Sequence, residues 1–223
     1  HGFNTRFGVA VFRYAQIIKD SGAPVAPVLF TWPSRGGIYA YNYDRESTNF
    51  SRDALEAGLL RAAHNDKVKE ITVLAHSMGA WLAMEALRQS AIREGRVPAK
   101  VTNVILASPD LDIDVFVRQF QMLGPDRPKF TIFVSNDDRA LRLSRLIAGN
   151  VGRLGAINPT QEPYLSLLEN SGVTVIDMSK LRTGERLNHS KFAESPDVVK
   201  LIGQRLIEGQ PLTDSRVGIG DHV

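Results

Sequence analysis

The chain has 223 residues, of which 43% are hydrophobic and 23% are charged, a balance typical of one medium-sized globular domain. It contains no cysteine, which excludes disulfide frameworks, thiolate nucleophiles and zinc sites built on sulfur. The 27 basic residues barely exceed the 24 acidic residues, and like charges nowhere form a block, so the sequence argues against nucleic-acid binding.

The predicted elements of the first half begin with a helix near 5–20, followed by a buried strand over 26–32. A loop rich in Gly and Tyr follows that strand and leads to a helix near 51–64. No apolar stretch reaches the roughly 18 residues of a membrane span, and we therefore expect no transmembrane segment. The chain begins at His1 without a signal peptide pattern, so it indicates no compartment.

The second half alternates strands with helices almost without interruption. The predicted strands lie at 70–76, 100–108, 127–135 and 172–179. The predicted helices lie at 78–93, around Phe116 and Phe120, at 138–149 and from Pro196, where Ser195 is the expected N-cap. The segment 149–172 is predicted to be looser, and Arg139, Arg142 and Arg145 share one helix face, which is expected to be solvated unless it meets an anionic ligand or lipid.

This alternation predicts a mostly parallel sheet with helices on both faces, which is an α/β fold. We expect one domain over 1–208 and a flexible tail over 209–223. The connection from 108 to 128 holds one helix, so no large cap domain is expected there.

Ser77 lies in "LAHSMGAWL", where the predicted buried strand turns directly into a helix. The small residues Ala75 and Gly79 stand two positions to either side, as a turn that sharp requires. Serine is also a common helix N-cap, but polar residues after other strands favour the nucleophile. In chain order a serine, several aspartates and His189 follow strand ends, which is the order of nucleophile-elbow hydrolases.

A serine hydroxyl needs an imidazole to accept its proton, and the imidazole needs a carboxylate to orient it. Among the five histidines, His189 is the one well placed as the base. Asp110, Asp137 and Asp138 all follow strand ends, and the residue pattern alone leaves the acid open. Backbone N–H donors must also bind the developing oxyanion, and the Met78 amide is one candidate.

The segments "HGFN", "TWPSRG", "AHSMGAW", "SPDLDIDVF", "SNDDRALRLS" and "NHSKF" together resemble the α/β-hydrolase superfamily. Within it they are similar to a bacterial esterase/lipase-like subgroup described as a domain of unknown function. The resemblance spans residues 1 to about 208. It implies an apolar strand before His1-Gly2, so we expect that this strand is missing from the given chain.

The resemblance also implies roles for individual residues. The family's G-x-x-D-x-x-V spacing favours Asp138 as the acid, with Asp110 as the main alternative, and the Phe3 amide is the expected second oxyanion donor. Independently of the resemblance, Trp32 and Tyr41 lie at or after the end of a predicted strand and are candidates for a pocket wall. Ala75 replaces the first glycine of G-x-S-x-G, a small-for-small departure.

The sequence therefore predicts a serine hydrolase that cleaves carboxylic esters of small molecules through an acyl-enzyme. No cofactor is expected, and no metal, because no two histidines have ligand spacing on one element. A thioester, lactone or amide would use the same machinery. The alternative from another class is a non-catalytic module of the same fold that binds a ligand or a protein.

Overall fold

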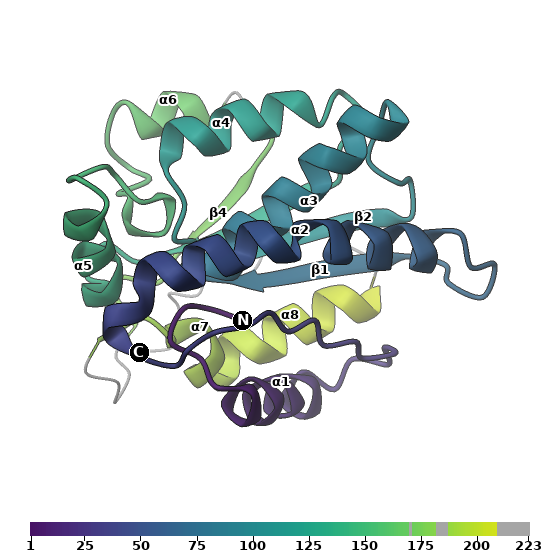
Figure 1. The fold of residues 1–223 in the computed structure, drawn as a ribbon, viewed down its shortest axis with the longest axis horizontal. Coiled ribbons are helices and arrows are strands. Elements are labelled where there is room, and N and C mark those ends of the chain that lie inside the picture. The colour runs from purple at the N-terminus through teal and green to yellow at the C-terminus, as the bar shows by residue number, and fades with distance from the viewer. Residues whose placement is uncertain (170, 182–186, 209–223) are drawn as a thin grey trace.

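The computed structural model describes residues 1–169, 171–181 and 187–208, and its centre is a parallel sheet of four strands (Figure 1). The strands are β1 (Ile71–His76), β2 (Val101–Ala107), β3 (Lys129–Val134) and β4 (Thr174–Asp177), and they lie side by side in chain order. Each neighbouring pair is parallel. All strands therefore end at the same edge of the sheet, where parallel α/β folds gather functional groups.

Helices cover both faces of this sheet (Figure 1). They are α1 (Phe7–Ser21), α2 (Tyr41–Ala63), α3 (Met78–Glu94), α4 (Ile113–Met122), α5 (Arg139–Ile147), α6 (Tyr164–Glu169), α7 (Lys191–Glu194) and α8 (Pro196–Glu208), with short 3₁₀ turns η1 (Ile38–Ala40) and η2 (Leu154–Ala156). Helices α1 and α8 pack together on one face, whereas α2, α3 and α4 lie on the other. The predicted α/β fold with helices on both faces is confirmed.

The alternation of side chains along β2 shows how one strand serves two cores. Val104 and Leu106 belong to the core under α3 and α4, whereas Ile105 and Ala107 belong to the core under α1 and α8. Because successive side chains of a strand point to opposite faces, a strand that is buried on both faces must be apolar throughout. This explains the continuous apolar run over 101–107.

The strand predicted over 26–32 is wrong, because this segment belongs to no strand in the structure. The backbone there is irregular, and Val28 is 82% exposed. Prolines at 24, 27 and 33 have no N–H to donate to a sheet ladder, which disfavours pairing despite the apolar composition.

The helix predicted near 51–64 begins ten residues earlier than expected, because α2 starts at Tyr41. The side chain of Asp44 is completely buried in its first turn and accepts hydrogen bonds from the backbone of Asn4 and Arg35. These long-range contacts hold the Gly- and Tyr-rich segment in a helix, and local composition does not encode them. The segment 149–172, predicted to be loose, contains η2 and α6, and the predicted tail over 209–223 lies outside the described residues.

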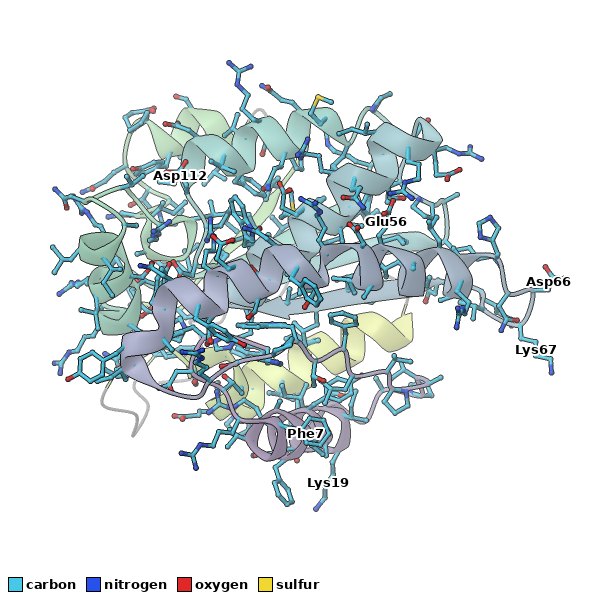
Figure 2. The ribbon with its side chains drawn as sticks, viewed as in Figure 1. Phe7, Lys19, Glu56, Asp66, Lys67 and Asp112 are labelled. Carbon is cyan, nitrogen blue, oxygen red and sulfur yellow. The ribbon has the colours of Figure 1, made fainter. Side chains whose placement is uncertain are left out.

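Two ends of the molecule can be located in the figures. Asp66 and Lys67 mark the turn that leads into the amino end of β1 (Figure 2). Helix α5 lies at the opposite end, beyond the carboxyl ends of the strands (Figure 1). The candidate site lies at this second end.

Candidate active site

Ser77 is the single residue between the end of β1 at His76 and the start of α3 at Met78. Its backbone has φ 54° and ψ −123°, a conformation that costs a non-glycine residue about 1–3 kcal/mol. The Ser77 N–H donates to the carbonyl of Ala107, and the Ser77 carbonyl accepts from the N–H of Asp110. The neighbouring strand β2 and the loop after it therefore hold the turn in its strained form.

The N-terminal segment His1–Phe3 lies directly against this turn. A Cβ added to Gly2 would come within 2.8 Å of the Ser77 Cβ, and one added to Gly79 would come within 2.6 Å of the His1 carbonyl oxygen. Both distances are shorter than real Cβ contacts allow, so glycine is required at both positions. Gly79, which the sharp turn already requires to be small, thus also leaves room for the N-terminal segment.

The predicted oxyanion donors lie at this junction. Met78 is the first residue of α3, where the partial positive charge of a helix N-terminus favours an anion. Within the described part of the chain, the backbone N–H groups of Met78 and Phe3 have no hydrogen-bond acceptor. Neither donor is therefore used by the hydrogen bonds of the described residues.

His189 and Asp138 are brought together across 51 positions of the sequence. The distance from His189 Nδ1 to Asp138 Oδ2 is 2.7 Å, and the carboxylate is completely buried whereas the imidazole remains 15% exposed. The second carboxylate oxygen, Asp138 Oδ1, accepts the N–H of Leu141 and so caps α5. Both oxygens are thereby fixed, and the carboxylate orients the imidazole.

No hydrogen bond joins Ser77 Oγ to His189 within the described ranges. His76 links them, because it precedes Ser77 in the chain and its ring centroid lies 4.8 Å from that of His189. Catalytic hydrogen bonds are often long in structures without substrate, so this geometry is compatible with a nucleophile and its base.

His76 is the residue of this site that the sequence reasoning missed. Its Nε2 lies 3.3 Å from the carbonyl oxygen of His189, and since a carbonyl only accepts, His76 Nε2–H is the donor. Burial, followed by the proximity of His189, holds the pKa of His76 well below 6.5. A second imidazole directly before the serine was the available signal.

Asp137, the other candidate acid, anchors the loop that carries His189. Its carboxylate lies 2.7 Å from the completely buried Lys191 ammonium and accepts from the Asn188 amide at 3.0 Å. Burial acts to raise the pKa of Asp137, but the hydrogen bonds from Lys191 and Ser135 outweigh it and hold that pKa below its usual 3.8. Asp137 and Asp138 thus both form hydrogen bonds to the loop that carries His189.

Asp110, the alternative acid, lies in a different network. It accepts from the hydroxyls of Tyr41 and Ser144 and lies 3.3 Å from Arg153 Nε. The carboxylate beside His189 is therefore that of Asp138.

The two expected pocket-wall residues have different surroundings. Trp32 is 4% exposed, stacks on the His1 ring and donates its indole N–H to the His1 carbonyl, so its observed contacts support the N-terminal segment. Tyr41 packs edge-to-face against Phe3, with ring centroids 5.3 Å apart. Aromatic contacts therefore hold the Phe3 backbone in place near the turn.

The described residues contain neither a metal-binding cluster nor a membrane-spanning helix. No group of three or more His, Cys, Asp and Glu side chains in these ranges could hold a metal ion. None of the helices described is long and apolar enough to cross a lipid bilayer.

Comparison with known proteins identifies the class. Residues 1–205 match the family described as "Alpha/beta hydrolase of unknown function (DUF900)", and the chain belongs to this family. It is also 34% identical over 108 residues to an uncharacterized protein, alr1448, of Nostoc sp. (strain PCC 7120). That match covers 46% of this chain and only 28% of the Nostoc protein. No solved structure was found to match the chain.

Proposed function

We propose that the protein is a serine hydrolase that cleaves carboxylic esters of small molecules through an acyl-enzyme. The observation that carries this proposal is the strained turn at Ser77, which directly follows His76, whose ring lies 4.8 Å from the imidazole of the Asp138–His189 pair. A sparsely populated backbone conformation at a polar residue indicates a function when surrounding contacts enforce it. Here hydrogen bonds with β2 and with the loop that follows it enforce the conformation.

In the proposed reaction Ser77 Oγ attacks the ester carbonyl carbon while His189 Nε2 accepts the hydroxyl proton. Asp138, bonded to Nδ1, holds the ring in the tautomer that leaves Nε2 free and stabilises the imidazolium. The carbonyl oxygen becomes an oxyanion that accepts from the N–H groups of Phe3 and Met78. When the tetrahedral intermediate collapses, the alcohol leaves with the proton from His189.

The second half of the reaction reverses these roles. A water molecule gives its proton to His189 Nε2 and attacks the acyl-enzyme carbonyl. The carboxylic acid then leaves, and Ser77 Oγ recovers the proton. No cofactor enters any step.

The test compares the wild type with Ser77→Ala for hydrolysis of p-nitrophenyl acetate and butyrate and for labelling by a fluorophosphonate probe. The matched control is Ser90→Ala, which changes a buried serine of α3 whose hydroxyl has no hydrogen-bond partner in the described residues. We expect turnover and labelling to vanish together in Ser77→Ala and to persist in Ser90→Ala.

The other outcomes are equally informative. Labelling of Ser77 without ester turnover would indicate an activated serine that acts on a different acyl bond, such as a thioester, lactone or amide. A folded wild type that is neither labelled nor active would contradict the proposal and favour the non-catalytic binding module.

A further inference from the structure

A second site lies beside α5, in a cavity of about 270 Å³ that opens between α5, the segment after it and the start of α6. Three arginines line it, namely Arg142, Arg145 and Arg153. Asn136 and Tyr164 add polar groups, and Ile113 belongs to the apolar part of the wall. Asp112, immediately before Ile113, marks the neighbouring start of α4 in Figure 2.

The positive charge in this cavity is only partly balanced. Arg153 is 6% exposed and pairs with Asp110 through Nε, at 3.3 Å and without hydrogen-bond geometry. Arg142 donates to the backbone carbonyl of Asn136, which carries no charge. In the described ranges Arg145 has neither an ion pair nor a side-chain hydrogen bond. Two guanidinium groups therefore face the cavity without a carboxylate partner.

A phosphate group matches this arrangement in charge and in geometry. A phosphate monoester carries a charge close to −2 at pH 7, which equals the charge of the two uncompensated arginines. Guanidinium groups bind phosphate oxygens through paired N–H donors, and the Tyr164 hydroxyl and Asn136 amide can satisfy further oxygens. A single carboxylate would leave one positive charge unmatched.

We propose that this cavity binds the phosphate group of a phosphate monoester. It is distinct from the site at Ser77, because Asp110 stands between the two, with its N–H bonded to the Ser77 carbonyl and its carboxylate paired with Arg153. The phosphate monoester is either a soluble metabolite or a lipid headgroup. The outer side of α5 exposes Leu143, Leu146 and Ile147, which is compatible with the second source.

The experiment measures binding in the Ser77→Ala background, so that turnover plays no part. Isothermal titration with inorganic phosphate and with glycerol 3-phosphate is carried out at constant ionic strength set by sodium chloride. Sedimentation with phosphatidylcholine vesicles, with and without phosphatidic acid, tests the lipid source. The variants are Arg142→Gln and Arg145→Gln, and the matched control is Arg118→Gln, an exposed arginine of α4 outside the cavity lining.

We expect Arg142→Gln and Arg145→Gln each to weaken binding about tenfold, as the loss of a charge-assisted hydrogen bond implies. Arg118→Gln should bind as its parent does. Binding of glycerol 3-phosphate that depends on Arg145 assigns a soluble ligand, and binding confined to phosphatidic acid vesicles with the same dependence assigns a lipid headgroup. If no probe binds, or if all three variants bind equally, the proposal is overturned.

Discussion

The backbone of Ser77 is held in a conformation that its own side chain disfavours. A positive φ brings Cβ close to the following carbonyl group, and glycine alone avoids this cost. The fold compensates through the hydrogen bonds with Ala107 and Asp110. The protein therefore gives up stability at this residue.

Replacement of Ser77 by glycine should make the protein more stable than replacement by alanine. Glycine relieves a strain of about 1–3 kcal/mol at the cost of roughly 0.5–1 kcal/mol of chain entropy, so we expect Ser77→Gly to exceed Ser77→Ala by about 1 kcal/mol in free energy of unfolding. Urea denaturation of both variants measures this difference. Equal free energies of unfolding for the two variants would show that the turn is unstrained. Neither variant should have esterase activity, because both lack the hydroxyl group.

The sequence located part of the site, and tertiary contacts account for the rest. Ser77 and His189 stand out because their order and spacing reflect chemistry that needs those residue types. The residue pattern alone left the acid open among Asp110, Asp137 and Asp138, because all three follow strand ends. The spacing of the resembled family favoured Asp138, and the structure pairs Asp138 with His189. The contact of His76 with His189 joins residues 113 positions apart, which no local pattern encodes. The catalytic roles themselves stay predictions.

At the scale of elements, the residue that caps the N-terminus of α5 has two roles. One oxygen of Asp138 caps the helix through the Leu141 N–H, while the other orients His189. Asparagine caps helices as well as aspartate does, whereas alanine does not. The two duties can therefore be separated by the choice of substitution.

Asp138→Asn should lose activity without losing the cap. We expect the esterase kcat to fall by about 10³–10⁴ in both Asp138→Asn and Asp138→Ala, because neither holds a negative charge beside the imidazole. Asp138→Ala should in addition lose about 1 kcal/mol of unfolding free energy, because alanine cannot cap α5. Steady-state kinetics and urea denaturation measure the two effects, and an active Asp138→Asn enzyme would contradict the assignment of the acid.

Element prediction succeeded where periodicity and burial agree, as in β2 and α3, and failed where distant contacts or backbone chemistry decide. The apolar composition of 26–32 predicted a strand, but prolines interrupt its hydrogen-bonding capacity. The early start of α2 depends on buried Asp44, whose partners lie up to 40 positions away. In both cases local composition carries less weight than the supply of hydrogen-bond partners.

At the scale of the whole molecule, stability should depend on pH through His76. This imidazole is buried in its neutral form, so its pKa lies well below 6.5 in the folded protein and close to 6.5 in the unfolded chain. Below pH 6.5 the unfolded chain binds a proton that the folded protein does not. The free energy of unfolding therefore decreases as the pH decreases. Asp137, whose pKa is lowered, acts in a separate window, because its contribution is present above about 3.8 and is lost below that value.

Between pH 7.5 and pH 5.5 the wild type should therefore lose about 1 kcal/mol of unfolding free energy through His76, since a full proton difference is worth roughly 1.4 kcal/mol per pH unit. His76→Gln should remove this loss. Chemical denaturation of both proteins at the two pH values tests it. The same pH dependence in His76→Gln would assign the effect to another group.

The shared duty of Asp138 bears on how the ancestry of this site can be traced. Selection for a well-formed α5 would by itself retain aspartate, asparagine or serine at the cap, even in a descendant that had abandoned hydrolysis. The imidazole of His189 caps no helix, and its described contacts are the hydrogen bond to Asp138 and the ring contact with His76. Substitutions at position 189 should therefore reveal a loss of hydrolysis earlier than substitutions at position 138. An acid at position 138 can persist because it caps α5.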